Sequence, residues 1–120
     1  MKQIKKVHKH GEKFDSKLEL YFYEQLRSNN IPFEFQVCYE LIPSFKYDGK
    51  GVRAMTLTVD FDFTEHGLNV VVDTKGFWRN DNKLKWKMFQ WCNENQPKLF
   101  FPKSQKECLE VIQLIKTMKK

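Results

Sequence analysis

The feature that most constrains the fold is an uninterrupted valine run that ends in polar and charged residues. Residues 70–72 are all valine, and Asp73, Thr74 and Lys75 follow directly. β-Branched residues favour strands, and an apolar run without alternation is typical of a strand that is buried on both faces. Such a strand needs cover on each side, so the run predicts a sheet flanked by helices, with charged side chains where the strand leaves the core.

Three helices are predicted around this strand. A capping box at residues 16–19 opens the first, which stops at Asn29 and carries an apolar face of Leu18, Tyr21, Phe22 and Leu26. A second, over residues 80–94, carries its apolar face at Leu84, Met88, Trp91 and Cys92. Another capping box, at residues 104–107, opens the last helix, whose expected inward residues are Leu109, Ile112 and Ile115, with Val111 and Leu114 as further candidates.

The predicted fold has four strands, of which the valine strand is one. Residues 33–42 alternate apolar and polar side chains, as a half-buried strand does. Residues 52–63 present one face of Met55, Leu57, Val59, Phe61 and Phe63, with Asp60 and Asp62 opposite. This strand and the valine strand form a central hairpin, and a right-handed crossover through the 80–94 helix brings residues 98–101 alongside in parallel. The fold class is therefore α/β (mixed α+β): a central mixed sheet flanked by helices, in the order αβββαβα.

Composition limits the classes of protein that this chain can belong to. The 120 residues are 41% hydrophobic and 15% aromatic, which excludes a disordered polyelectrolyte and suits one domain over residues 1–120. A basic arm at residues 1–13 and a basic tail are expected to fray. The net charge of +6 suggests a polyanionic partner.

The cysteines and the absence of long apolar segments point to the cytoplasm. Cys38, Cys92 and Cys108 lack metal-ligand spacing and are expected to be reduced thiols. No stretch approaches the roughly 18 apolar residues of a membrane span, and no apolar segment follows the basic N-terminus. We therefore expect a cytoplasmic protein without a membrane partner.

Three titratable groups are expected to converge at the end of the valine strand. Asp73 and Lys75 project to one side of that strand, and Asp60 lies on the preceding strand of the hairpin. Burying carboxylates beside a hydrophobic sheet costs several kcal/mol unless they are paired or bind a cation, and carboxylates suit a hard cation such as Mg²⁺. The alternatives are an Asp73–Lys75 ion pair with a solvent-facing Asp60, and a purely capping role for Glu19.

These residues resemble a known nuclease core. Glu19 on an N-terminal helix, then Asp60, then Asp73, Thr74 and Lys75 on a second strand, look like the PD-(D/E)xK core of restriction enzymes and Holliday junction resolvases. The strings HGEKFDSKLELYFYEQL, FQVCYELIPSF, VDFDF, VVDTKGFW and KLKWKMF are similar to a family of small phage-encoded proteins assigned to that superfamily. Val59 stands where the superfamily's name has proline.

The resemblance implies an activity and a role for each residue. It implies a restriction-endonuclease-like core and a metal-dependent endonuclease that cuts branched DNA, such as Holliday junctions in phage recombination or replication, as a homodimer. Asp60, Asp73 and the Thr74 carbonyl would hold Mg²⁺, for which Mn²⁺ could substitute, and Glu19 would complete the site. Lys75 would orient the attacking water or stabilise charge on the phosphate. The alternative is a non-catalytic nucleic-acid-binding protein with a basic, aromatic surface.

A second set of residues could contact DNA outside this centre. Its members are polar or cationic and lie on the 33–42 strand or after the valine strand: Gln36, Arg79, Lys83, Lys85 and Lys87. Solvated positions on a strand or helix are the alternative for all of them. Trp78 and Trp86 could stack on unpaired bases or pack in the core.

Overall fold

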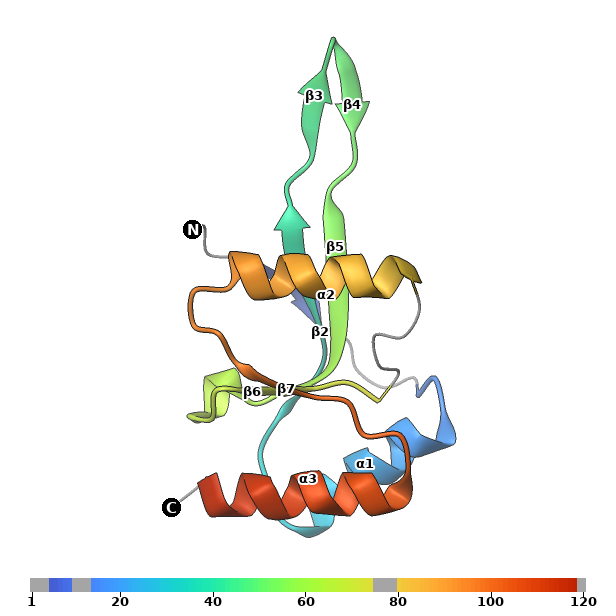
Figure 1. Cartoon of the computed structure of the whole chain (residues 1–120), viewed down its shortest axis with the longest axis vertical. Helices are drawn as coiled ribbons and strands as arrows, with labels where there is room; N and C mark the ends of the chain where they lie inside the picture. Colours follow the sequence, from blue (N-terminus) through green and yellow to red (C-terminus); the bar gives the residue numbers. More distant parts are fainter. Residues whose placement is uncertain (1–4, 10–13, 75–79, 119–120) are drawn as a thin grey trace.

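A mixed α/β fold is confirmed: a computed structural model places a mixed sheet between α2 on one face and α1 and α3 on the other (Figure 1). The structure describes residues 5–9, 14–74 and 80–118. Its elements run in the order β1 (Lys5–Lys9), α1 (Lys17–Ser28), β2 (Glu34–Ile42), β3 (Phe45–Tyr47), β4 (Lys50–Val52), β5 (Met55–Asp62), a 3₁₀ turn (Thr64–His66), β6 (Val70–Val72), α2 (Asn80–Cys92), β7 (Lys98–Phe100) and α3 (Gln105–Met118).

The valine strand lies inside the sheet, as predicted. Within the described residues the strand order is β1-β2-β5-β6-β7, so β6 has a neighbour on each edge. It pairs antiparallel with β5 and parallel with β7. Val70 and Val72 pack against α1 and α3, whereas Val71 packs against α2. Helices therefore cover both faces, and the predicted hairpin and parallel pair are confirmed.

The long strands β2 and β5 change face part-way along, which the sequence did not predict. Val37 and Val59 belong to the core cluster under α2, whereas Phe35 and Phe61 belong to the cluster under α1 and α3. Residues two apart on a regular strand point to the same face of the sheet. Here they point to opposite faces, so the regular alternation is interrupted between Phe35 and Val37 on β2 and between Val59 and Phe61 on β5. The prediction that residues 55–63 present one apolar face is therefore wrong.

The backbone of Gln36 accompanies this change of face. Gln36 has a φ of +53°, in the left-handed region that residues with a Cβ rarely adopt. Registered pairs on either side, Phe35 with Phe61 and Val37 with Val59, place Gln36 across from Asp60. The irregularity lies in the middle of two paired strands, so it re-aims the side chains that follow it.

Part of the basic arm is a strand rather than a frayed segment. β1 pairs antiparallel with β2, with Lys5 opposite Glu40 and Lys9 opposite Val37. The low hydrophobicity of residues 1–13 concealed this strand because an edge strand needs only one hydrogen-bonded neighbour. The expectation that the arm is frayed is wrong for residues 5–9.

The predicted apolar faces of two helices need correction. α2 buries Trp86 and Phe89 and leaves Leu84 and Trp91 exposed. α3 buries Val111, Ile112 and Ile115 as expected, but Leu109 is exposed and Cys108 takes an inward position. α2 is therefore rotated from its predicted face, whereas α3 keeps most of its predicted face and exposes only Leu109 and Leu114 of the predicted residues. Apolar residues surround α2 too widely for the sequence alone to choose the inward stripe.

The capping box at the start of α1 forms with one change of partner. Ser16 Oγ accepts from the Glu19 N–H at 3.1 Å, as predicted. The Glu19 carboxylate accepts from the Asp15 N–H at 2.6 Å instead of from the Ser16 N–H. Ser104 and Glu107 repeat this arrangement at α3, with the Lys103 N–H as the donor.

The cysteines are free thiols, as expected. Burial, with a smaller contribution from Glu107, raises the pKa of the Cys108 thiol to about 11. Among the helices of the described ranges, none is both long and apolar enough to cross a bilayer.

A tight turn at Asp48 and Gly49 joins two short strands between β2 and β5. Asp48 and Gly49 both have positive φ, +53° and +77°, which matches the two central residues of a tight hairpin turn. The flanking strands β3 and β4 pair only with each other. Residues 45–52, called the ribbon from here on, project beyond the rest of the molecule at one end of its long axis (Figure 1).

Candidate active site

Asp60 and Asp73 lie opposite each other on neighbouring strands. The β5–β6 register pairs Phe61 with Val72 and Asp62 with Val71, so the next opposing positions are Asp60 and Asp73. The Asp60 N–H donates to Asp73 Oδ2 at 3.3 Å. The Asp73 N–H donates to the Phe100 carbonyl of β7 at 3.0 Å, which fixes the backbone at the end of the valine strand. The predicted meeting of these two carboxylates is confirmed.

Thr74 joins the pair from the residue after Asp73. Its N–H and its Oγ1–H both donate to Asp60 Oδ2, each at 2.9 Å. Asp60, Asp73 and Thr74 are 1%, 4% and 6% exposed. Asp60 therefore does not face solvent, and that part of the alternative is wrong; the Asp73–Lys75 ion pair stays a prediction because Lys75 lies outside the described residues. Two donors on one oxygen orient the Asp60 carboxylate before any ligand is present.

The pair has the chemistry that a hard cation prefers. Like charges directly opposite on antiparallel strands destabilise a sheet, and two carboxylates removed from water cost several kcal/mol unless something compensates them. The bonds from Thr74 compensate part of that cost at Asp60. A divalent cation would compensate both carboxylates, and the donors on offer are oxygen atoms of the kind that Mg²⁺ and Mn²⁺ bind. The side chains therefore fit the implied metal.

Glu19, the remaining carboxylate of the implied site, does not group with this pair within the described residues. Glu19 is fully buried on α1, and its carboxylate oxygen Oε1 caps the helix by accepting from the Asp15 N–H. In the ranges that the structure describes, no three His, Cys, Asp or Glu side chains form a group that could hold a metal ion, so Glu19 does not join Asp60 and Asp73 in one. Lys75 and Arg79 lie outside the described residues.

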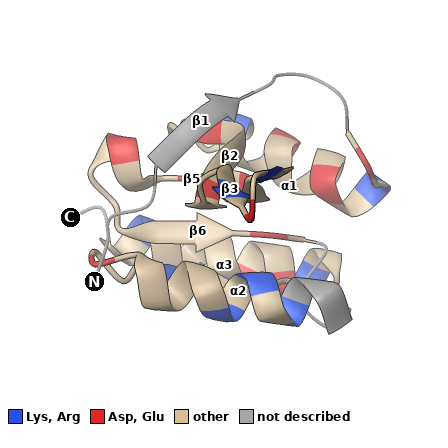
Figure 2. Ribbon diagram, turned by 90° about the horizontal axis from the view of Figure 1, so that it is seen from above, with Lys and Arg blue, Asp and Glu red and all other residues tan. Residues whose placement is uncertain are grey.

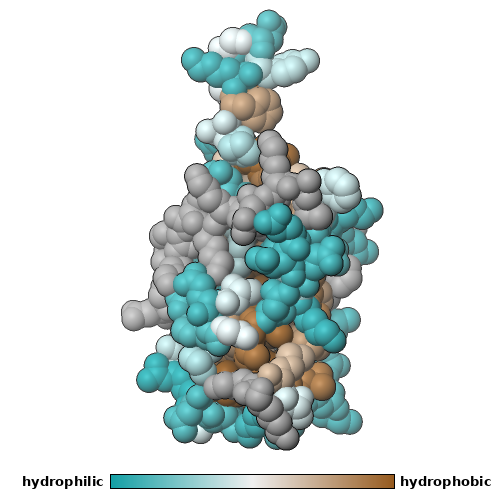
Figure 3. All heavy atoms as spheres, turned by 90° about the vertical axis from the view of Figure 1, so that its left-hand side faces the viewer, coloured by the Kyte–Doolittle hydropathy of each residue, from teal (hydrophilic) through white to brown (hydrophobic). Residues whose placement is uncertain are grey.

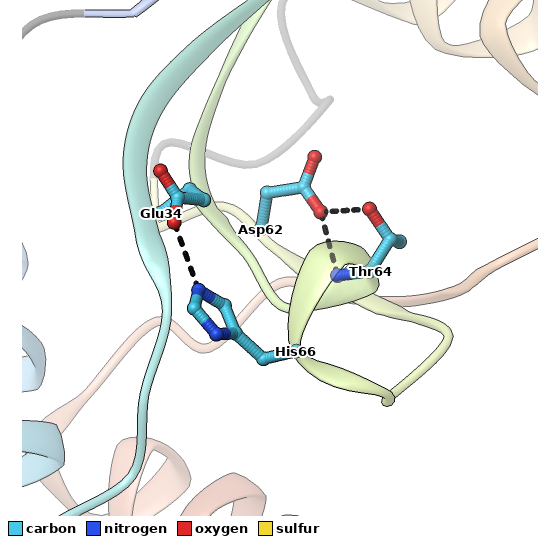
Figure 4. A network of polar contacts seen from close by, with 4 residues as sticks. All are labelled: Glu34, Asp62, Thr64 and His66. Carbon is cyan, nitrogen blue, oxygen red and sulfur yellow. Dashed lines mark hydrogen bonds and ion pairs between the residues drawn. The ribbon is translucent and has the colours of Figure 1, made fainter.

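Asp62, which the sequence placed beside Asp60, has a separate structural role. It accepts from the Thr64 N–H at 2.8 Å, from Thr64 Oγ1 at 2.6 Å and from the Tyr39 hydroxyl. Figure 4 shows Asp62 and Thr64 at the start of the 3₁₀ turn, beside a Glu34–His66 ion pair of 2.8 Å. The Asp62 carboxylate is therefore held by Tyr39 of β2 and by Thr64 of the turn after β5.

Replacing Tyr39 by Phe tests this role. Burial, and then the hydrogen bond to Asp62, raise the pKa of Tyr39 above its ordinary value. We expect Tyr39→Phe to lower the free energy of unfolding by about 1–3 kcal/mol at pH 7, because it leaves a buried carboxylate short of a donor. A raised tyrosine pKa stabilises the fold below the ordinary pKa and loses that contribution as pH rises, so wild-type stability falls above about pH 10.

Urea unfolding at pH 7.5 and pH 10.5 checks both parts of this prediction. The loss of stability between the two pH values is expected to be smaller in Tyr39→Phe than in wild type. Tyr47→Phe, at an exposed tyrosine of the ribbon, is the matched control and should leave both values unchanged. Equal alkaline losses in wild type and Tyr39→Phe would contradict the assignment.

The three lysines predicted to contact DNA lie on α2. Lys83 and Lys87 are exposed and Lys85 is half-buried. Figure 2 shows basic residues along α2 and an acidic segment directly after β6. Gln36 lies away from these lysines, on β2, across from Asp60 of β5. Trp86 is a core residue in edge contact with Phe89 and Phe101, so its predicted base-stacking alternative is wrong. Trp78 lies outside the described residues.

Two exposed apolar features were missed by the sequence reading. One is Trp91 on α2, which the sequence predicts on the apolar face of the helix but which is 72% exposed. The other is the ribbon, where Phe45 is 45% and Tyr47 73% exposed. Alternating side chains on both sides of the Asp48-Gly49 turn were the available signal for the ribbon, since such alternation is typical of a hairpin.

Comparison with known proteins identifies a family. The model of a family described as "Protein of unknown function (DUF1064)" matches residues 2–108, which include every residue of the candidate site. No curated protein matches this chain. No solved structure matches it either.

Proposed function

The chain belongs to the DUF1064 family, and we propose that it is a metal-dependent DNA endonuclease of the PD-(D/E)xK type. The observation that carries the proposal is the buried Asp60–Asp73 pair on adjacent strands, followed by Thr74 and Lys75. Carboxylate oxygens are the ligands that a hard divalent cation prefers, and two of them meet here on adjacent strands, which supports a bound metal ion as the proposed role of the pair.

Each residue of the site has a distinct task in this proposal. Asp60 and Asp73 hold Mg²⁺ or Mn²⁺ with their carboxylate oxygens, helped by the Thr74 carbonyl. Glu19 does not group with them in the described residues, so its proposed part in the site is through water. The ion supplies Lewis acidity toward the scissile phosphodiester and toward water. Thr74 holds Asp60 in place through its two hydrogen bonds. Lys75 orients the attacking water or stabilises negative charge on the phosphate.

The proposed substrate is branched DNA, such as a Holliday junction. The basic residues on α2 and the net charge of +6 suit a polyanion. The resemblance to Holliday junction resolvases favours DNA structure over sequence as the target. Resolving a junction takes two cuts, so we propose a homodimer as the working form.

A cleavage panel tests the proposed function. The protein is incubated with a four-way junction, a flap and a linear duplex, each with Mg²⁺, Mn²⁺ or EDTA. We expect cutting with either metal, none in EDTA, and a preference for the junction. The control for specificity is Asp62→Asn, which changes a buried aspartate outside the site and is expected to keep cutting.

The second candidate function is nucleic-acid binding without catalysis. Exposed Lys83, Lys87 and Trp91 on α2 favour it, because cationic and aromatic side chains together bind unpaired strands. Binding to all three DNAs without cutting under any metal condition would establish this alternative and exclude the endonuclease.

A further inference from the structure

The ribbon has no partner within the described residues that would account for its side chains. Its two strands pair only with each other, with Phe45 opposite Val52, Lys46 opposite Gly51 and Tyr47 opposite Lys50. Every residue from 45 to 52 is exposed. An isolated two-stranded hairpin is marginally stable in water, so a projecting one with exposed aromatic residues implies burial against something else.

The two faces of the ribbon differ in chemistry. Opposed residues share a face, so Phe45, Val52, Tyr47 and Lys50 lie on one side. Lys46 and Gly51 lie on the other, where a Cβ added at Gly51 would meet nothing within 4 Å. Figure 3 shows the projecting end with hydrophobic atoms beside hydrophilic ones. One face therefore offers aromatic contact, and the other offers a cation beside accessible backbone.

The charge on this segment selects the class of partner. Lys46, Lys50 and Arg53 lie on or next to the ribbon, against the single carboxylate of Asp48. A second copy of the chain would bring the same positive charge to the contact, whereas a polyanion is attracted to it. We propose that the ribbon enters a groove of duplex DNA with its aromatic face toward the groove. Lys50, on that face, and Lys46, on the other, each contact a phosphate along the sides of the groove.

The size of the ribbon suits this role. The major groove of B-form DNA, about 12 Å wide, admits a two-stranded β-ribbon. The chain from Gly49 to Asp60 spans at most about 36 Å at 3.3 Å per residue, which corresponds to about ten base pairs. The ribbon therefore contacts a duplex arm up to one helical turn from the candidate active site. This inference rests on the proposed function for the identity of the substrate, and it adds the part of the protein that binds a duplex arm of that substrate.

Binding measured in EDTA tests the ribbon separately from cleavage. The assay uses four-way junctions with arms of about 6 or about 15 base pairs, at several salt concentrations. We expect the wild-type protein to prefer long arms by about tenfold. Lys46→Ala/Lys50→Ala should lose that preference and lower the slope of log K against log salt by about 2, one for each phosphate contact. Tyr47→Ala should weaken long-arm binding about tenfold without changing the slope.

Matched controls lie on α3, at the end of the molecule away from the ribbon (Figure 1). Lys106→Ala/Lys116→Ala removes the same charge from exposed positions, and Leu114→Ala truncates an exposed apolar side chain. Both are expected to keep the wild-type preference for long arms. Because every residue of the ribbon is exposed, thermal unfolding of its variants should match that of wild type, which keeps folding out of the comparison.

The outcomes separate this inference from the proposed function. Wild-type affinity and slope in the ribbon variants would overturn the inference, whatever the cleavage result. Loss of a dimer in sedimentation by Tyr47→Ala, with DNA affinity unchanged, would overturn it too and make the ribbon an interface between copies. Ribbon-dependent binding without cleavage would support the inference and exclude the endonuclease. No binding to either junction would overturn both.

Discussion

Asp73→Asn is expected to abolish metal-dependent cleavage while leaving the fold intact. The substitution keeps the size of the side chain and removes one of the two opposed charges, so the Asp60–Asp73 pair can no longer compensate a divalent cation. We expect the cleavage rate to fall by about 10³-fold or more, in the range seen when a catalytic site loses a principal charge-stabilising group. Single-turnover cleavage of a four-way junction with Mg²⁺ measures this loss.

The same variant is expected to lose the stabilisation that Mg²⁺ gives to the wild-type protein. Mg²⁺ should raise the melting temperature of wild type, because a ligand that binds only the folded state stabilises it. It should leave that of Asp73→Asn unchanged.

Asp62→Asn is the matched control, since it makes the same chemical change in a neighbouring buried aspartate. Asp62 accepts from Tyr39 and Thr64, so its loss of charge weakens these bonds and should lower stability by about 1–2 kcal/mol. Its cleavage should persist. The two variants therefore shift stability and activity in opposite patterns. Full cleavage by Asp73→Asn would exclude the proposed site.

Phe61→Ala is expected to have the largest effect on stability. Phe61 is fully buried and its ring lies 4.8 Å from that of Phe22, 5.4 Å from that of Phe35 and 5.6 Å from that of Phe33, between centroids. Truncation removes the shared contacts of this aromatic cluster and leaves a cavity, which costs about 3–5 kcal/mol. That is a large part of the roughly 5–15 kcal/mol that holds a domain folded.

Urea unfolding at pH 7 measures this effect. Leu109→Ala serves as the control because its side chain is 43% exposed on α3, and it should change stability by less than about 0.5 kcal/mol. A loss below about 1 kcal/mol in Phe61→Ala would contradict the packing of the aromatic cluster.

The sequence predicted the elements well because their signals are local. Capping boxes depend on residues three apart, and the valine run needs no knowledge of its neighbours, so α1, α3 and β6 were found. The failures concern choices between faces. Leu84 and Trp91 match a helical stripe as well as Trp86 and Phe89 do, and only the position of the sheet decides which pair is buried.

The candidate site was predictable in part for the same reason. The order of Asp60 and Asp73 along a hairpin fixes their meeting, once the turn between the strands is placed. The separate role of Asp62 was not predictable, because period-two alternation puts it beside Asp60 and its partner Tyr39 lies 23 positions earlier in the chain. The left-handed Gln36 has no signal in its residue type, since glycine is the usual choice there.

The change of face along β5 limits which amino-acid substitutions the sequences of this family can accept. Asp60 lies between Val59, packed under α2, and Phe61, packed under α1 and α3, so both hydrophobic clusters determine where its carboxylate stands. A displacement of about 1 Å at a catalytic group can cost about 100-fold in rate. Substitutions in either cluster are therefore expected to reduce activity before they unfold the chain. Compensating changes are expected to arise in the opposite cluster, between residues that never touch.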